Sequence, residues 1–212
     1  MQNKNIFRRW ANAFLTLKKS YILPYIYKYG NIGIDSYIQT PALIDGAKNI
    51  FLGDHVHIKG HCTILTVGEG KLIIKKDFDC GIGFTAIASN HHQAIGVRGR
   101  SNNDNIYRDI IIEEDVWVGA FVTLLSGTNI GRGCIIGANT VIRGAVIPPY
   151  AIVIGNPAKI IGFRYTPDEI IAHEALLYQE ENRISISTLK DNYEKYYLSR
   201  KNEIHKFKSI LL

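Results

Sequence analysis

The sequence lacks the features that define several classes of protein. No apolar run approaches the ~18–20 residues needed to span a bilayer, and the N-terminus has no apolar segment followed by a small-residue cleavage site. Only three cysteines occur in 212 residues, and no two form a CxxC pair, which argues against a disulfide framework or a zinc cluster. No nucleic-acid-binding module accompanies the net charge of +6. We therefore expect a cytoplasmic protein that binds no nucleic acid.

The aliphatic residues of the second half follow neither the strand period of two nor the helix period of 3.6. They recur instead at every sixth position, at Ile112, Val118, Leu124, Ile130, Ile136 and Ile142. The fifth position of each of these hexads is small or β-branched, and hexads that begin with an apolar residue also occur in an earlier block from Leu52 to Thr85. Ile32, Ile38 and Ile44 begin weaker hexads before it. The sequence is therefore an internal repeat of six residues.

A six-residue period suits a short strand followed by a tight turn, and three such units close one triangular coil. Coils stack, strands pair in parallel along the stack, and first-position side chains fill the interior, because no single hexad buries its own apolar residue. Cys62 and Cys134 fall at fifth positions and Cys80 at a first position, so we interpret all three as small buried hydrophobes.

This pattern over about residues 30–165 resembles the hexapeptide-repeat acyltransferases. The resemblance implies an all-β core, a left-handed parallel β-helix of hexapeptide repeats. It has an extruded loop and helical N- and C-terminal appendages. We expect an N-terminal helical appendage at 1–30, a β-helix catalytic domain at 31–165 with a polar loop at 91–109, and a C-terminal helical tail at 166–212. The repeat is also interrupted at Thr66–Lys71.

Both appendages show helical patterns. Thr166, Pro167 and Glu169 form the start signal of one helix, with a capping box; a second helix is expected at about 188–208. His173 and His205 lie in these helices and are expected at the surface. Near the N-terminus, one helical face collects Ile6, Trp10, Ala13, Phe14 and Leu17 beside basic neighbours. That helix either docks on its own protein or a neighbouring subunit, or lies on a membrane surface and makes the protein peripheral to the inner membrane.

The stretch "ASNHHQ" marks the entrance to the long loop. In the family a histidine at this junction is the general base, and the resemblance assigns that role to His91. Imidazole suits it, because it is largely neutral near pH 7 and still accepts a proton. His92 is interpreted as a loop residue near the acceptor. The "NH" pair also resembles the xenobiotic acetyltransferase branch.

Further motifs imply an acetyl-CoA site. The tryptophan of "DVWVGA", Trp117, flanks acceptor or cofactor in relatives, and Ala120 offers a backbone group to the pantetheine arm. Ala138, in "IGA", lines the CoA groove. Basic residues near the last coil hold the nucleotide phosphates in the family, and the candidates carried over by the resemblance are Arg143, Lys159 and Arg164. No metal is expected.

Lys59 lies near the position where galactoside-type relatives have a sugar-binding asparagine. We therefore expect an acceptor that is not a neutral galactoside, and hypothesise that Lys59, with His57 or His61, recognises an acidic or phosphorylated sugar.

The resemblance implies an acetyl-CoA-dependent O-acetyltransferase acting on a carbohydrate hydroxyl of a capsule, lipopolysaccharide or related glycan, as a homotrimer with sites between subunits. The tail "RYTPDEIIAHE" is similar to that of bacterial sugar and polysaccharide O-acetyltransferases. Four alternatives stay open. They are an antibiotic O-acetyltransferase, a nucleotide-sugar N-acetyltransferase, a γ-type carbonic anhydrase using His55 and His91, and a non-catalytic scaffold.

Overall fold

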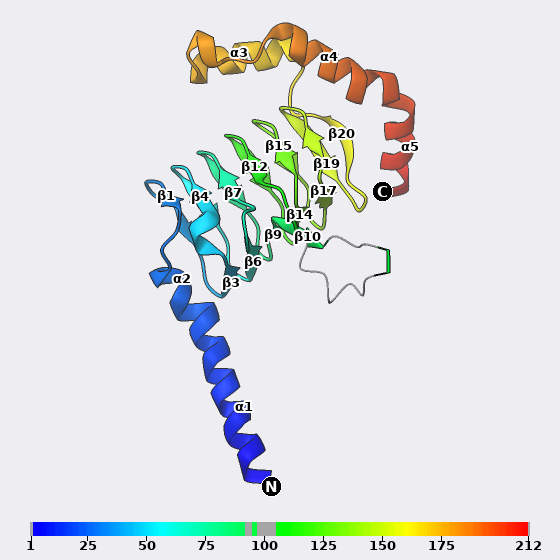
Figure 1. Ribbon diagram of the computed structural model, residues 1–212. Coiled ribbons are helices and arrows are strands. Elements are labelled where there is room, and N and C mark those ends of the chain that lie inside the picture. Colours follow the sequence, from blue (N-terminus) through cyan, green and yellow to red (C-terminus); the bar gives the residue numbers. More distant parts are fainter. Residues whose placement is uncertain (1, 92–94, 97–104, 212) are drawn as a thin grey trace.

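Stacked coils of short strands form the body of the protein. The computed structural model describes residues 2–91, 95–96 and 105–211, and the side chains of those between 6 and 206. A helix projects from the end of the stack that carries the first strands, and further helices lie along one edge of the stack and at its other end (Figure 1). The predicted parallel β-helix of hexapeptide repeats with terminal helices is confirmed, while its left hand stays a prediction of the resemblance.

Three sheets form the walls of the prism. Each of the first five coils contributes one strand to each wall, and the last coil contributes strands to the first and second walls only. The first wall contains β1 (Asn31–Ile32), β4 (Ile50–Leu52), β7 (Leu72–Ile74), β12 (Ile110–Ile112), β15 (Asn129–Ile130) and β18 (Val146–Ile147). The second wall contains β2 (Tyr37–Ile38), β5 (Val56–Ile58), β8 (Phe78–Cys80), β13 (Val116–Val118), β16 (Ile135–Ile136), β19 (Ala151–Ile154) and β20 (Lys159–Phe163). The third wall contains β3 (Ala42–Asp45), β6 (Cys62–Leu65), β9 (Thr85–Ile87), β14 (Thr123–Leu125) and β17 (Val141–Arg143).

The strand register places the predicted first-position residues in columns inside the prism. In the second wall, Val118 is paired with Cys80 on one side and with Ile136 on the other. Every member of the six-residue series is 0% exposed: Ile112, Val118, Leu124, Ile130, Ile136 and Ile142. The interior is therefore a continuous apolar core, built from one side chain per hexad.

The three cysteines are free and buried, as predicted. Burial raises the pKa of the Cys62 thiol to about 11 and those of Cys80 and Cys134 to about 12. Such thiols stay protonated at neutral pH and are poor nucleophiles. Their role is packing.

Two positions depart from the repeat. Ile32 is 43% exposed because β1 is an edge strand of the first wall, with a neighbour on one side only. Val146, at a fifth position, is 73% exposed rather than buried. Ile112 pairs with Ile130, 18 positions on, whereas Ile130 pairs with Ile147, 17 positions on. The last coil is thus one residue shorter, and the shift turns Val146 outward.

The stack ends where the chain reverses. The strand β20 pairs antiparallel with β19, after the turn at Asn156–Pro157. The helix α3 (Pro167–Leu177) follows, and its predicted capping box is present: the Thr166 hydroxyl accepts from the Glu169 N–H, and the Glu169 carboxylate accepts from the Thr166 N–H. A short turn, η4 (Glu180–Asn182), leads to the next helix.

The prediction of one continuous second helix in the tail is wrong, because the structure has two helices there. They are α4 (Ile186–Tyr196) and α5 (Lys201–Leu211), separated by the 3-10 turn η5 (Leu198–Arg200). No glycine or proline marks this break in the sequence. His205 is exposed, as expected. His173 is not: it is half-buried between the rings of Tyr150 and Tyr165, at centroid distances of 6.0 and 5.3 Å.

The N-terminal segment consists of α1 (Gln2–Leu17), a π-helical stretch, η1 (Lys18–Ile22), and α2 (Leu23–Ile26). Its base is fixed to the first coil, where Pro24 is buried and accepts a 2.8 Å hydrogen bond from the Tyr29 hydroxyl. The α1 helix itself points away from the prism (Figure 1). The interpretation that this helix docks on its own chain is therefore wrong. Among the described residues, no helix has the length and apolar character required to cross a membrane.

The predicted loop leaves the third wall as an antiparallel ribbon. Its two strands are β10 (Ser89–His91) and β11 (Asn105–Tyr107). The tip of the loop, including His92, lies outside the described residues. We retain the division 1–30, 31–165 and 166–212 as a proposal for the domain organisation.

Candidate functional site

His91 is the last residue of β10, at the base of the extruded loop. Its backbone N–H donates to Asn90 Oδ1 at 2.9 Å, and its side chain is exposed. The same strand contributes Ser89 and Asn90 to a cavity of about 220 Å³, which Leu125, Ser126 and Arg143 complete. An exposed imidazole beside a small polar cavity can accept a proton from a bound hydroxyl.

Asn105 is directly opposite His91 in the β10–β11 ribbon. Directly opposed residues place their side chains on the same face of an antiparallel pair. The Asn105 Nδ2 donates to the Tyr107 hydroxyl at 3.2 Å, while its Oδ1 is buried and has no hydrogen-bond partner among the described residues. A buried carbonyl oxygen without a donor is unusual. Sequence reasoning missed this residue, because the antiparallel pairing across the loop was not predicted.

A column of polar and aromatic side chains follows the outer face of the second wall. Strand pairing aligns Tyr37, His57, Asp79 and Trp117 at successive levels. The Tyr37 ring stacks on His57 with a centroid distance of 4.7 Å, and Trp117 is 52% exposed. Aromatic faces beside polar groups suit the ring and hydroxyls of a sugar.

Lys59 and His57 both contact Tyr37, at the end of this column that lies in the first coil. The Lys59 ammonium donates to the Tyr37 hydroxyl at 3.1 Å, and this hydrogen bond raises the pKa of the lysine. His57 lies between two carboxylates, 3.8 Å from Asp35 and 3.6 Å from Asp79. His61, at the next corner, is exposed. Tyr37 is a further residue that sequence reasoning missed, since its contacts come from a different coil.

A cavity of about 320 Å³ lies along the same column and collects several carboxylates. Its lining comprises His55, His57, Asp77, Asp79, Asp115, Val116, Trp117, Ile135 and Arg164. The backbone conformation explains why three of these positions hold His or Asp. His55, Asp77 and Asp115 all have positive φ angles at one corner of the prism, and Asp and His are enriched in that conformation. Within the described ranges, no group of three His, Cys, Asp or Glu side chains is arranged to hold a metal ion.

Ala120 and Ala138 occupy equivalent places on two successive coils, at the corner between the second and third walls. A Cβ on Gly119 would lie 2.6 Å from the Ala138 nitrogen, so the coils are in close contact there and glycine is required. The Ala120 carbonyl accepts from the Asn139 N–H. Ala138 is exposed. This small-residue corner leaves backbone accessible to an extended ligand.

The three predicted phosphate-binding residues differ in their surroundings. Arg143 is exposed, lines the cavity beside β10, and makes no ion pair with any residue that the structure describes. Lys159 contributes, after Arg200, to lowering the pKa of Glu203 on α5. Arg164 donates to Asp115 Oδ2 at 2.7 Å and to the Gly133 carbonyl at 3.1 Å. Through those contacts Arg164 joins the end of β20 to the preceding coils, which is a structural role.

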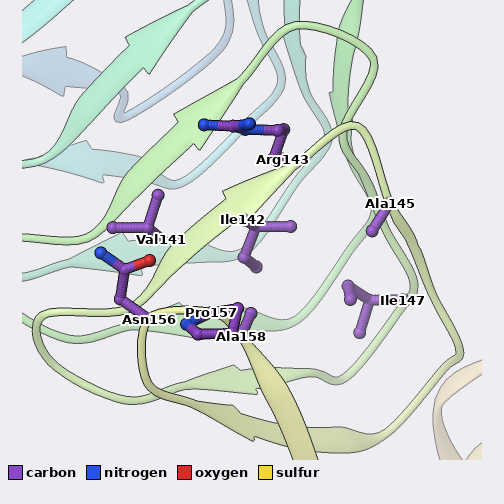
Figure 2. Close-up of a pocket in the computed structure, with 8 residues that line it drawn as sticks. All are labelled: Val141, Ile142, Arg143, Ala145, Ile147, Asn156, Pro157 and Ala158. Atoms are coloured by element: carbon purple, nitrogen blue, oxygen red, sulfur yellow. The ribbon is translucent and has the colours of Figure 1, made fainter.

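Arg143 also borders a second cavity, of about 420 Å³, at the last coil. Figure 2 shows Arg143 and Asn156 on one side of it, with Ala145 and Ile147 on the other. The lining residues are Val141, Ile142, Arg143, Ala145, Ile147, Asn156, Pro157 and Ala158. The lining is largely apolar, with one guanidinium and one carboxamide.

Within one chain the predicted residues fall into separate groups. His91 and Arg143 lie at the edge of the third wall, Trp117, His57 and Lys59 on the second wall, and Ala120 and Ala138 at the corner between the two walls. Of the three cavities described above, those of about 420 and 220 Å³ are lined by Arg143 and that of about 320 Å³ by Trp117.

Residues 109–144 match the family model described as "Bacterial transferase hexapeptide (six repeats)". The chain is 35% identical over 123 residues to the "Putative lipopolysaccharide biosynthesis O-acetyl transferase" of Escherichia coli K12, covering 54% of this chain and 58% of that protein. It is 42% identical over 86 residues to a "Probable macrolide acetyltransferase" of Lysinibacillus sphaericus, covering 41% and 46%. The chain thus spans about half the length of the curated relatives it matches.

A hexapeptide-repeat acetyltransferase of Vibrio cholerae O1 biovar eltor, solved in complex with acetyl-coenzyme A, has the same fold. The TM-score is 0.59 and the sequences are 26% identical, over 72% of this chain and 85% of that one. The predicted resemblance is confirmed: the chain carries bacterial transferase hexapeptide repeats and shares sequence and fold with hexapeptide-repeat acetyltransferases.

Proposed function

We propose that the protein is an acetyl-CoA-dependent O-acetyltransferase with His91 as its general base and a carbohydrate as its acceptor. One observation carries the proposal. An exposed histidine lies at the loop junction of a chain similar in sequence to an acetyltransferase solved with acetyl-coenzyme A. The repeats supply a rigid support for that histidine.

The proposed reaction is a direct acyl transfer. A neutral His91 imidazole nitrogen takes the proton of the acceptor hydroxyl while the acceptor oxygen forms a bond to the acetyl carbonyl carbon. The tetrahedral intermediate then collapses, the carbon–sulfur bond breaks, and the sulfur leaves as the thiolate of CoA, which takes the proton back from the imidazolium. The products are an acetyl ester and CoA, and His91 is again neutral.

Asn105 supports this role as a positioning residue. Asn105 is the residue opposite His91, and its Oδ1 is buried and has no hydrogen-bond partner among the described residues. A carbonyl oxygen there can accept from the Nδ1–H of His91, which would leave Nε2 free to accept the acceptor's proton. The sidechain amide would thus select one tautomer of the base.

The donor is proposed to lie along the corner formed by Ala120 and Ala138, with its phosphates toward Arg143 and Lys159. Arg143 is the stronger candidate, because its guanidinium has no ion pair with the described residues, whereas Lys159 lies near the Glu203 carboxylate. Arg164 is a weaker candidate, since Asp115 and the Gly133 carbonyl already occupy its guanidinium.

The acceptor is proposed to contact the column on the second wall, with Trp117 as an aromatic surface and Lys59, His57 and His61 as polar groups. A cation at Lys59 favours an acidic or phosphorylated sugar. The relative named for lipopolysaccharide biosynthesis supports a glycan acceptor, while the one named for macrolides keeps an antibiotic hydroxyl as the second candidate.

We further propose a homotrimer. The third-wall edge with His91 and the second wall with Trp117 are separate in one chain, so a site that uses both needs a neighbouring subunit. Rotation about a closed symmetry axis brings different surfaces of identical subunits together. Sedimentation of the purified chain as a monomer at working concentrations would contradict this arrangement.

The decisive experiment combines CoA titration with a transfer assay. Calorimetry should show saturable CoA binding, weakened about tenfold or more by Arg143→Ala and less by Lys159→Ala, because a charged hydrogen bond to phosphate is lost. Transfer is followed as release of CoA thiol with acidic glycans, neutral galactosides and macrolides as acceptors. His91→Ala should lower turnover by about 10²–10⁴-fold with CoA affinity unchanged.

Two control variants sharpen the result. His205→Ala removes an exposed histidine of α5 and should leave turnover unchanged. Asn105→Ala should lower kcat and shift its pH profile, whereas a merely structural role would alter stability without moving the profile. A folded parent that binds no CoA sinks the transferase proposal, and turnover by His91→Ala at the parental rate removes His91 as the base.

A further inference from the structure

The helix α1 has an apolar face and basic residues beside it, and within the part of the chain that the structure describes its apolar side chains are exposed. Its apolar face consists of Ile6, Trp10, Ala13, Phe14 and Leu17, at the spacing of one side of a helix. Trp10 is 73% exposed and Phe14 67% exposed. Contiguous apolar surface of this kind on a soluble body marks an interaction site.

The charge around this face is of one sign. The first 34 residues contain six of the 25 basic side chains, namely Lys4, Arg8, Arg9, Lys18, Lys19 and Lys28, and no acidic residue. The remaining residues carry 19 basic and 19 acidic side chains and are formally neutral. The first 34 residues therefore account for the whole net charge of +6, and five of their six basic residues lie in α1 and η1, before the junction with the prism (Figure 1).

Two partners can cover an apolar helical face: another helix or a lipid surface. Helices that pair with copies of themselves carry acidic and basic residues flanking the seam, which form ion pairs between chains. The α1 segment offers no acidic residue for such a pair, so its copies would repel one another. A basic polar face opposite Trp, Phe and Leu is the composition of helices that lie in the interface of anionic membranes.

We propose that α1 docks the protein on an anionic membrane surface. The apolar face enters the boundary between headgroups and acyl chains, and Arg8, Arg9, Lys18 and Lys19 contact lipid phosphates. Trp10 suits that depth, because indole combines an apolar ring with a polar N–H. The helix lies in the membrane plane rather than crossing it, since Arg8 and Arg9 stand in its middle and would otherwise be placed in hydrocarbon.

The junction between α2 and the first coil determines which end of the prism lies near the membrane. Pro24, Tyr25 and Tyr29 fix α2 to the first coil, with the Tyr25 hydroxyl 3.2 Å from Thr40 Oγ1. The end of the prism that carries β1 is therefore held near the surface on which α1 lies. If the chain is the trimer proposed above, three α1 helices leave the same end and bind one surface together, which increases avidity.

Flotation of the purified full chain with lipid vesicles tests the proposal. Vesicles of phosphatidylcholine and phosphatidylglycerol in equal parts should bind the protein, and pure phosphatidylcholine vesicles should bind it far more weakly. The double variant Arg8→Gln/Arg9→Gln should reduce partitioning roughly thirty-fold, since each basic side chain near an anionic surface contributes about a factor of five. Trp10→Ser/Phe14→Ser should reduce it at least as much.

Matched controls are available on the C-terminal helices. Lys190→Gln/Lys201→Gln removes the same charge, and Leu176→Ser removes an apolar side chain that is likewise exposed; both should bind as the parent does. In a Trp117→Phe background Trp10 is the one remaining tryptophan, and its emission should shift to the blue on binding. Equal binding to both vesicle types, equal loss in the control variants, or concentration-dependent association of α1 without vesicle binding would each overturn the proposal.

Discussion

The prism and the C-terminal helices are stabilised by contacts of different kinds. Inside the prism, every hexad contributes one aliphatic side chain to a column, and any single member has similar neighbours above and below it. The tail is joined to the prism by a small apolar cluster that contains Tyr150, Ile170 and Leu189, and by a few specific polar contacts. Glu174 of α3 is 0% exposed and accepts from Arg132 at 3.2 Å and from the Tyr150 hydroxyl at 3.0 Å.

The polar cluster joins three parts of the chain. Arg132 belongs to a corner of the prism, where it also donates to Glu114 at 3.1 Å, and its guanidinium lies 3.9 Å above the Tyr178 ring. The second Glu174 oxygen accepts from the backbone N–H of Ile184, which precedes α4. Repetition distributes the stability of the prism over many similar contacts, whereas in the tail one buried carboxylate joins Arg132, Tyr150 and the backbone of Ile184.

The largest expected effect comes from the prism interior. Leu124→Ala removes a fully buried side chain from the third wall and leaves a cavity between the coils above and below. Its cost should be about 3–4 kcal/mol of the free energy of unfolding. Denaturant titration measures it. Val146→Ala, at an exposed position of the repeat, is the matched control and should stay within about 0.5 kcal/mol of the parent.

A smaller and more local effect is expected in the tail. Glu174→Gln keeps the shape of the side chain but removes the charge that Arg132 and Tyr150 face, at a cost of about 2 kcal/mol. Hydrogen exchange should increase in α3 and α4, while the amides of β12–β16 keep the protection of the parent. Glu181→Gln, an exposed neighbour, serves as control. Equal loss of protection in the prism strands would show that tail and prism unfold as one unit.

The six-residue period explains why the interior was predictable. It fixes which side chain of each hexad points inward, and the six first-position residues, spaced six apart between Ile112 and Ile142, are all buried. Val146 shows the limit of this reasoning, because the loss of one residue in the last coil changes the phase without changing the local composition. The break between α4 and α5 was also not predictable, since neither glycine nor proline accompanies it.

The candidate site was predictable residue by residue only through family motifs. Spacing alone does not bring Lys59 to Tyr37, or Asn105 to His91, because both pairs depend on which coil lies above which or on how the long loop closes. Arg164 was predicted to bind phosphate although it lies one residue away from the usual basic position of the family, and its contacts with Asp115 and Gly133 are those of a structural residue. The partial burial of His173 depends on Tyr150 and Tyr165, which both lie outside α3, so a helical pattern could not reveal it.

The smallest expected effect lies at the start of the tail. Thr166→Ala removes the hydroxyl that caps α3 and should cost about 1 kcal/mol. The loss should depend on pH. The backbone N–H and the hydroxyl of Thr166 both donate to the Glu169 carboxylate and lower the pKa of Glu169 in the folded state. The substitution removes the hydroxyl's contact, which is fully present above the ordinary glutamate pKa and is lost as the pH falls through the lower, folded value. Unfolding measured at pH 7 and at pH 3 compares the two states. A cost of Thr166→Ala that is equal at both values would mean that the hydroxyl alone, rather than the reciprocal pair, fixes the first turn of α3.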